Sequence, residues 1–237
     1  MLVPTYNEAA SLPRLLARLA VAVPDADVLV IDDASPDGTA DIADRLAADD
    51  PRISVLRRAG KDGLGRAYRA GYAVALERDY RYVVQIDADG SHPPETLPEM
   101  LAVARAEPRP DLVIGSRWVP GGRTVDWSAG RERLSRAANG YARRILRLPV
   151  ADLTAGYRVY RAEALRRLDL ASVRSHGYYF QVEMTVRIAD AGGAVAEVPI
   201  VFAEREAGAS KMTFGIILEA MVKVTTLGVR RRLRRSS

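Results

Sequence analysis

The sequence predicts an α/β protein with a doubly wound, mostly parallel sheet of the Rossmann-like kind. In the first half of its 237 residues, short apolar runs alternate with longer stretches whose leucines and alanines recur at helical spacing. This alternation is typical of βαβ units, in which consecutive strands run parallel. Aspartates follow two of the apolar runs, at 32–33 and 87–89. Because such sheets bind ligands at the carboxyl ends of their strands, the pattern also predicts where a site lies.

The expected elements follow one another in a regular order. The apolar runs predict strands over residues 2–3, 28–31, 53–56, 82–86, 112–115 and 195–202. Helical spacing predicts helices over residues 7–23, 39–48, 65–78, 94–106, 130–148 and 214–228. Asp37, just before Gly38 and Thr39, supplies a carboxylate that caps the second helix.

The last of these helices is amphipathic. One apolar stripe is formed by Phe214, Ile217, Met221 and Val224. Glu219 and Lys223 form an i,i+4 pair on the other side. We therefore expect a main domain over residues 1–212, followed by an amphipathic helix and a basic tail over residues 213–237.

Composition excludes several classes of function. The chain has no cysteine and two histidines, which excludes disulfide scaffolds, thiol nucleophiles and polyhistidine metal sites. Five arginines lie within residues 229–237, and without them 30 of the 35 basic residues remain, equal to the 30 acidic ones. The main domain is therefore neutral, and we expect no nucleic-acid partner for it. The start resembles no signal peptide and no uncharged apolar run of about 18 residues occurs, so we expect a cytoplasmic protein.

Asp87 and Asp89 are the strongest candidates for chemistry. In an extended segment, side chains at i and i+2 point to the same side, so both carboxylates could share one divalent cation. Oxygen ligands favour Mg²⁺ or Mn²⁺, and such a cation can stabilise a departing diphosphate. The alternative is a polar turn that closes a strand.

A second group of polar residues follows the first two strands. Asp33 could accept hydrogen bonds from a ribose or a base, Tyr6 could stack on a base, and Glu8 could accept from either. The alternative is an ordinary helix start. The glycine-rich stretch 60–65 does not fit a nucleotide loop: Val55 and Tyr68 stand where the Walker and dinucleotide patterns require glycine. ATPase and dehydrogenase functions are therefore disfavoured.

Two cationic segments suggest anion binding. Residues 117–147 hold eight arginines against two acids, and guanidinium groups bind phosphate in a fork. Residues 205–212 combine small residues with Arg205 and Lys211, as in a loop that closes over a phosphate. The alternatives are a solvated helix face and a surface loop.

Taken together, the motifs resemble glycosyltransferase family 2, and within it the polyprenyl-phosphate (dolichol-phosphate) mannose synthases. The matching elements are VPTYNE (3–8), VLVIDDASPDGT (28–39), KDGLGRAY (61–68), QIDADGSHPPE (85–95), IGSRWVPGG (114–122), the spacing of Trp127, Arg131 and Ser135, DLTAGYR (152–158) and RxxGxSKM (205–212). The resemblance implies a GT-A fold for the main domain. It also implies an inverting, metal-dependent transfer of mannose from GDP-mannose to a polyprenyl phosphate.

The resemblance further implies roles for individual residues. It assigns catalysis to Asp89, Arg117, Arg131 and Ser135, and it assigns binding of the acceptor phosphate to the last three of them. It assigns binding of the metal, Mg²⁺ or Mn²⁺, to Asp87, Asp89 and Ser91. It assigns binding of the nucleotide sugar to a larger set: Pro4, Tyr6, Glu8, Ile31, Asp33, Asp87, Ala88, Asp89, Arg117, Arg205 and Lys211. We expect His92 to be a structural turn residue, not a proton shuttle.

A phosphate monoester is largely dianionic at neutral pH, so it can attack a sugar without a strong base. This fits an arginine-rich site.

The amphipathic helix and the five arginines predict peripheral contact with the anionic cytoplasmic face of a membrane, and a polytopic membrane partner is a further expectation. Three alternatives stay open: a UDP-sugar-dependent glucosyl or N-acetylglucosaminyl transferase, a non-catalytic nucleotide-sugar-binding module, and RNA binding by the tail.

Overall fold

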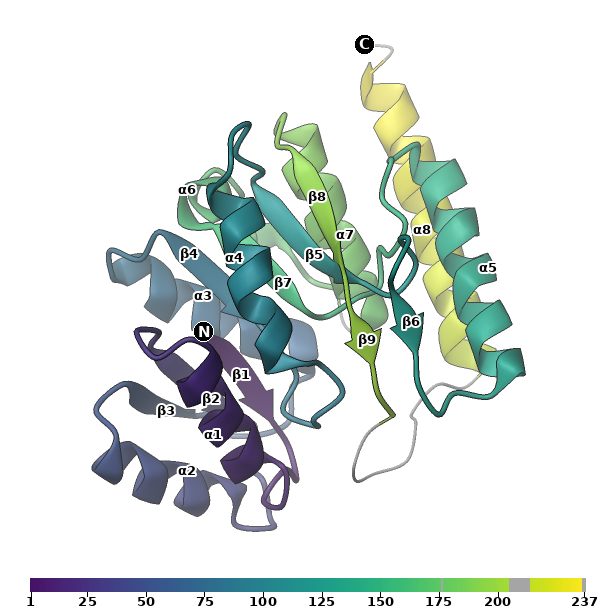
Figure 1. The fold of residues 1–237 in the computed structure, drawn as a ribbon. Helices are drawn as coiled ribbons and strands as arrows, with labels where there is room; N and C mark the ends of the chain where they lie inside the picture. Colours follow the sequence, from purple (N-terminus) through teal and green to yellow (C-terminus); the bar gives the residue numbers. More distant parts are fainter. Residues whose placement is uncertain (176, 205–213, 236–237) are drawn as a thin grey trace.

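A computed structural model describes residues 1–175, 177–204 and 214–235 (Figure 1). Its centre is a seven-stranded sheet in the order β3-β2-β1-β4-β7-β5-β8. The strands are β1 (Leu2–Thr5), β2 (Val28–Asp32), β3 (Ile53–Arg57), β4 (Tyr82–Gln85), β5 (Leu112–Ser116), β7 (Arg158–Arg161) and β8 (Val195–Pro199). Only β7 runs antiparallel to its sheet neighbours, so the prediction of a mostly parallel sheet is confirmed.

Helices cover both faces of this sheet. They are α1 (Leu12–Ala22), α2 (Thr39–Asp49), α3 (Leu64–Glu77), α4 (Leu97–Arg105), α5 (Ala129–Leu146), α6 (Ala162–Arg166), α7 (Tyr178–Asp190) and α8 (Phe214–Arg235). Successive strand residues point to opposite faces, so Leu2 packs in one core with α3 and α7, whereas Val3 packs in the other with α1 and α4. The result is a three-layer α/β/α arrangement (Figure 1).

The predicted boundaries needed three corrections. The first helix begins at Leu12 instead of residue 7, because Asn7 has a positive φ of 63° and Pro13 occupies its first turn. The expected strand 195–202 is interrupted at Ile200, after which β9 (Val201–Phe202) pairs with β6 (Arg123–Thr124) in a separate ribbon. The elements β6, β7, α6 and α7 were not predicted at all.

The missed strand β7 contains an unusual buried cation. Arg158 has no exposed surface, and its guanidinium donates to the carbonyl oxygens of Leu153 and Ala155 at 2.9 and 2.7 Å and to Thr185 Oγ1 at 2.8 Å. A charged side chain on a central strand conceals the apolar pattern by which a strand is recognised. The same side chain ties the 153–155 segment to α7.

The C-terminal helix is longer than expected, and its arginines are not a tail. Helix α8 packs against α5 and α7 and continues through residue 235 (Figure 1). Arg231 is buried and donates to Asp190 Oδ1 on α7 at 2.6 Å and to the Leu146 carbonyl at the end of α5. The predicted pair Glu219–Lys223 is present, and Val224 is buried in the core. In the described residues, no helix is both long and apolar enough to cross a membrane.

We predict that Arg231→Ala lowers the free energy of unfolding by about 1–2 kcal/mol, because it removes charge-assisted hydrogen bonds to a partly exposed carboxylate and to a carbonyl. Urea titration measures the change. Arg230→Ala is the matched control, since Arg230 is exposed on the next position of the helix. Equal stability of the two variants would show that the Arg231 contacts do not fix α8.

Candidate functional site

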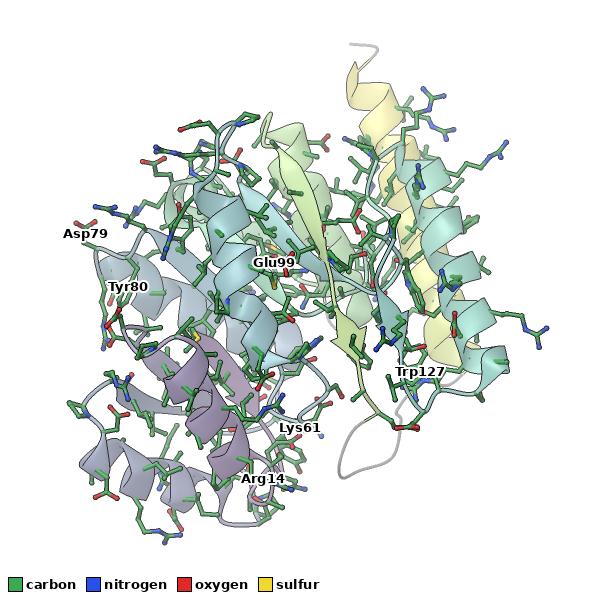
Figure 2. All side chains as sticks on the ribbon, viewed as in Figure 1. Arg14, Lys61, Asp79, Tyr80, Glu99 and Trp127 are labelled. Carbon is green, nitrogen blue, oxygen red and sulfur yellow. The ribbon has the colours of Figure 1, made fainter. Side chains whose placement is uncertain are left out.

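A cavity of about 480 Å³ lies at the carboxyl ends of β1, β2 and β4. Ten predicted site residues line it: Pro4, Tyr6, Glu8, Asp33, Asp87, Ala88, Asp89, Arg117, Arg131 and Ser135. Figure 2 labels two further lining residues, Lys61 and Trp127, well away from Asp79 and Tyr80 at the other end of the sheet. The structure therefore brings together residues that are up to 131 positions apart in sequence.

Two described residues among those predicted, Ile31 and Ser91, do not line the cavity. Ile31 is fully buried, and its side chain packs so closely on Gly71 that a Cβ at that glycine would lie 2.5 Å from Ile31 Cδ1. Ser91 also lies outside the cavity lining that the described residues form, although its buried Oγ has no hydrogen-bond partner among them. Arg205 and Lys211 fall outside the described residues.

Asp87 is held in place by two aromatic residues. Tyr68 OH donates to Asp87 Oδ1 at 3.2 Å, and His92 Nε2 lies 3.2 Å from Asp87 Oδ2. Burial raises the pKa of Tyr68 well above its usual value, so Tyr68 keeps its proton and remains a donor. Gly156 faces the same carboxylate, and a Cβ there would lie 3.1 Å from Asp87 Oδ2. His92 is therefore more than a turn residue, because it orients the Asp87 carboxylate.

The two acids suit a cation that takes much of its shell from substrate. Asp89 lies in a turn after β4, not in an extended segment as predicted, but both carboxylates still reach the cavity. Among the described residues, no group of three or more acidic, histidine or cysteine side chains could hold a metal ion. Mg²⁺ and similar ions are commonly held by one or two carboxylates together with substrate phosphates and waters. The residues present therefore fit such an ion when a diphosphate is bound.

The predicted nucleoside contacts follow β1 and β2, the strands that lie on one side of β4 in the sheet. Lys61 Nζ lies 3.6 Å from the centre of the Tyr6 ring, and Ser11 Oγ donates to Glu8 Oε2 at 2.7 Å. Asp33 forms an ion pair with Arg58. Burial raises the pKa of Asp33 above its usual value, although Arg58 acts in the opposite direction. No motif in the sequence pointed to this arginine partner.

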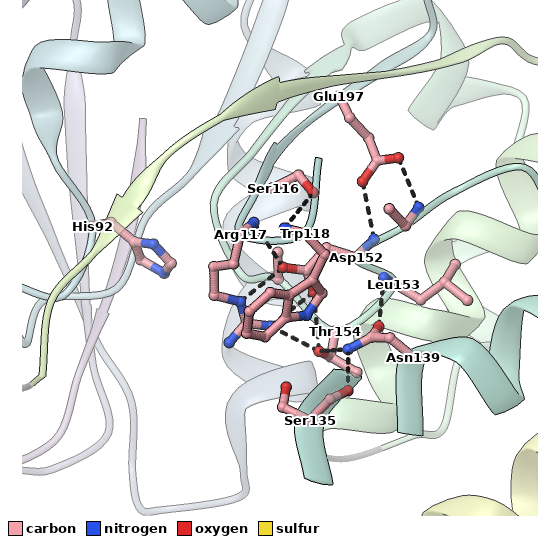
Figure 3. A network of polar contacts seen from close by, with 12 residues as sticks. His92, Ser116, Arg117, Trp118, Ser135, Asn139, Asp152, Leu153, Thr154 and Glu197 are labelled. Atoms are coloured by element: carbon pink, nitrogen blue, oxygen red, sulfur yellow. Dashed lines mark hydrogen bonds and ion pairs between the residues drawn. The ribbon is translucent and has the colours of Figure 1, made fainter. Parts of the chain in front are cut away.

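Arg117 is fixed by a buried carboxylate (Figure 3). Its Nε and Nη2 donate to the two oxygens of Asp152 at 2.7 and 2.8 Å, and Nη2 also donates to Thr154 Oγ1 at 2.9 Å. Burial alone would raise the pKa of Asp152, but the charge and hydrogen bonds of Arg117 hold it below its usual value. The guanidinium thus enters the cavity in one defined orientation, with its charge partly compensated.

Aromatic rings surround the two predicted phosphate-binding arginines. The Arg117 Cζ lies 5.2 Å from the Trp118 and Phe202 ring centres and 5.5 Å from that of Trp127. Arg131 lies closer, with its Cζ 3.9 Å above the Trp127 ring. Cation–π contacts of this kind hold guanidinium groups while leaving their edges available for hydrogen bonds.

Arg131 and Ser135 come from the start of α5. Ser128 caps this helix by accepting from the Arg131 backbone N–H at 3.3 Å. Arg131 and Ser135 are four residues apart, so they lie on one face, which also carries Asn139. Arg131 Nη1 also donates to Glu204 Oε1 at 2.7 Å, so an anion that binds Arg131 has an exposed carboxylate to displace.

Beyond the arginines the cavity becomes apolar. This end is lined by α5, α7 and α8 through Leu134, Ala138, Ala142, Val182, Ala220, Met221 and Val224. Leu134 and Met221 are also partly exposed, at 46% and 36%, so the apolar end opens to the surface between α5 and α8. The polar end was predicted from the sequence, but this apolar continuation was not.

Other lining residues were missed because their signal was weak. Gln181 on α7 is buried, and neither atom of its side-chain amide has a hydrogen-bond partner among the described residues. Thr154 and Gly156 lie in the segment DLTAGYR, which was matched as a motif without a role. Sequence spacing alone does not show that this segment touches Arg117 and Asp87.

Comparison with known proteins agrees with this geometry. Residues 1–169 match the model of the family described as "Glycosyl transferase family 2". An undecaprenyl-phosphate mannosyltransferase from Micrococcus luteus is 55% identical over 96% of this chain and 93% of its own length. A polyprenol monophosphomannose synthase from Mycolicibacterium smegmatis is 48% identical over all of this chain and 89% of its own length.

Solved structures show the same fold at low sequence identity. Glucosyl-3-phosphoglycerate synthase from Mycobacterium tuberculosis, in complex with phosphoglyceric acid, superposes with a TM-score of 0.68 at 18% identity, covering 95% of this chain and 79% of that one. Its complex with Mn²⁺ and UDP-glucose gives 0.65 at 20% identity, covering 95% and 76%. The sheet is therefore that of a GT-A glycosyltransferase, and the chain belongs to glycosyl transferase family 2.

Proposed function

We propose that the protein transfers mannose from GDP-mannose to a polyprenyl phosphate, with inversion at the anomeric carbon. The observation that carries this proposal is a single cavity with three groups of lining residues. Its lining combines two carboxylates that follow β4, two arginines, and an apolar wall from α5, α7 and α8. A nucleotide sugar, a phosphate and a lipid chain match these three groups of residues. The names of the two close relatives support both the sugar and the acceptor class.

The acidic end serves the donor. Asp87 and Asp89 would hold Mg²⁺ or Mn²⁺, with Ser91 beside them, and such an ion would supply countercharge to the diphosphate. The complex of a structural neighbour with Mn²⁺ and UDP-glucose supports a divalent ion in this fold. Tyr6, Glu8 and Asp33 contact the nucleoside. Arg205 and Lys211, which fall outside the described residues, remain predicted contacts of the diphosphate.

The arginines serve the acceptor. Arg117, Arg131 and Ser135 position the phosphate so that one of its oxygens attacks C1 of the sugar, while the bond from C1 to the diphosphate oxygen breaks and GDP leaves. The acceptor is a dianion at neutral pH, so no side chain has to remove a proton. We assign His92 the role of orienting Asp87, whose Oδ2 lies 3.2 Å from its Nε2, and not a role in proton transfer. The protein contributes position and charge, and these supply most of the rate enhancement in such reactions.

A surface beside the cavity mouth suits a membrane. The exposed residues of α8 include Val222, Val229 and Leu233, flanked by Arg230 and Arg232. The neighbouring α5 adds exposed arginines at 133, 136, 143, 144 and 147. The apolar end of the cavity opens between these two helices. This surface therefore docks peripherally on the anionic cytoplasmic face of a membrane, where a lipid chain can enter the cavity directly. A polytopic membrane partner at the same face is a further proposal.

The identity of the donor nucleotide distinguishes the proposed function from its main alternative, a transferase that uses a UDP-sugar. A structural neighbour was solved in complex with UDP-glucose, but at about 20% identity it does not identify the donor nucleotide of this protein. A UDP-sugar transferase to the same acceptor predicts that UDP competes better than GDP. A non-catalytic binding module predicts binding without turnover. Competition by the two nucleotides, measured in the transfer assay, separates these three functions.

We predict metal-dependent formation of an organic-extractable mannolipid when labelled GDP-mannose and a short polyprenyl phosphate are supplied. Asp89→Asn reduces this transfer by about 100-fold or more, because the diphosphate loses its countercharge. The control is Asp79→Asn, which changes an exposed aspartate at the far end of the sheet. Turnover that persists in EDTA, or in Asp89→Asn at the wild-type rate, would contradict the metal role.

Arg131→Ala should lower transfer by about 100-fold while donor binding stays unchanged, because the acceptor phosphate loses a charged donor. The assay uses a short, soluble acceptor, and calorimetric titration of GDP measures donor binding. Arg133→Ala removes an exposed arginine two positions along the same helix and serves as control. Equal transfer rates for Arg131→Ala and wild type would eliminate Arg131 as an acceptor contact.

Vesicles containing phosphatidylglycerol should bind the protein, whereas neutral phosphatidylcholine vesicles should bind it weakly. Each arginine near the surface contributes about 1 kcal/mol of attraction, and added salt weakens this attraction by screening. Val229→Asp with Leu233→Asp abolishes co-flotation, since both side chains are exposed on α8. Val21→Asp is the matched control, because Val21 is 85% exposed on α1. If the control loses binding to the same extent, α8 is not the docking surface.

A further inference from the structure

The segment 151–154 joins α5 to β7 and holds Arg117 through Asp152 and Thr154. It has no regular secondary structure of its own, so its position depends on side chains that reach it from other elements. Three such side chains do so, and each approaches from a different direction. They are Glu197 on β8, Asn139 on α5 and Arg158 on β7.

Glu197 fixes the start of the segment. Its two carboxylate oxygens accept from the backbone N–H groups of Ala151 and Asp152, at 2.7 and 2.9 Å (Figure 3). Glu197 lies outside the cavity lining that the described residues form. It therefore cannot act on a substrate directly, and any effect on transfer has to pass through the backbone of Asp152.

Asn139 fixes the other end of the segment and links it to α5. Its Oδ1 accepts from the Leu153 N–H at 2.9 Å, and its Nδ2 donates to Thr154 Oγ1 at 3.1 Å and to the Ser135 carbonyl at 3.0 Å. Thr154 Oγ1 in turn accepts from Arg117 and donates to Asp152 (Figure 3). One buried amide thus connects the helix that carries Ser135 with the segment that holds Arg117.

We infer that Glu197 and Asn139 are positioning residues for binding of the acceptor phosphate: together they fix the Arg117 guanidinium relative to Ser135 on α5. This inference rests on the proposed function, since it assigns the two residues to its acceptor contacts. The physical reason is that Asp152 and Thr154 occupy the Nε and Nη2 donors of Arg117, so these contacts set the direction in which its Nη1 donors point. The Asp152 carboxylate sets that orientation, and Glu197 sets the position of Asp152.

The first variant is Glu197→Gln. Its amide keeps one acceptor oxygen but turns an NH₂ group towards a backbone N–H, so one hydrogen bond becomes a repulsive contact. We expect kcat/KM for the acceptor to fall by about 10- to 100-fold, while the affinity for GDP changes less than about twofold. Glu163→Gln is the matched control, since Glu163 is an exposed glutamate that pairs with Arg161 at the far end of β7.

A second readout does not depend on turnover. The protein's two tryptophans, Trp118 and Trp127, both lie within 5.5 Å of the Arg117 guanidinium carbon. Intrinsic tryptophan fluorescence therefore reports on the position of Arg117. We expect a changed emission maximum or intensity in Glu197→Gln, and the wild-type spectrum in Glu163→Gln. If wild type itself shows no mannose transfer, the proposed function fails while this readout still tests the positioning.

A second pair of variants guards against simple misfolding. Thr154→Val removes the hydroxyl that joins Asn139 to Arg117 at almost constant shape, and Thr154→Ser restores the hydroxyl. Rescue of acceptor kcat/KM by serine, with non-additive losses when Glu197→Gln is combined with Asn139→Ala, supports one coupled network. Wild-type acceptor kinetics and fluorescence in Glu197→Gln, or additive losses in the double variant, would overturn the inference.

Discussion

The ion pair between Arg117 and Asp152 is the interaction on which the site depends. Burying a guanidinium and a carboxylate costs several kcal/mol per ion unless their remaining hydrogen bonds are satisfied. The surrounding structure meets this requirement with Thr154, with the backbone N–H of Arg117, and with aromatic rings around the guanidinium. The elements α5, β5, β8 and the 151–154 segment all contribute to it. The arginine side of the cavity is thus organised around the Arg117 guanidinium, whose charge Asp152 already compensates in part. An anion bound there would depend on the orientation of Arg117 and on the charge of Arg131.

Much of the fold was predictable because most of it obeys simple periodicities. Strands β1 to β5 are apolar runs, and the helices between them show helical spacing. The antiparallel strand β7 was not predictable in this way, because Arg158 and Arg161 occupy two of its four positions. A buried arginine that hydrogen-bonds to backbone carbonyls satisfies its polar groups through tertiary contacts, and these leave no trace in local sequence.

The candidate site shows a similar division. Asp87 and Asp89 could be found from the sequence, because acids after a strand are a local signal, and most residues implied by the family resemblance do line one cavity. Their partners could not be found. Asp87 is oriented by Tyr68, 19 positions away, and Arg131 by Trp127 and Glu204. The five clustered arginines predicted a basic tail that touches a membrane, yet Arg231 is buried between α5 and α7.

The place of α8 in the structure has a consequence for synthesis of the chain. Arg231 contacts the Leu146 carbonyl, 85 positions earlier, and Met221 and Val224 complete the apolar wall of the cavity. During translation, the N-terminal layers can form as they leave the ribosome. The apolar wall cannot be complete until α8 has emerged. A nascent chain therefore closes this side of the cavity only after α8 has been synthesised, later than the strands that carry the acids.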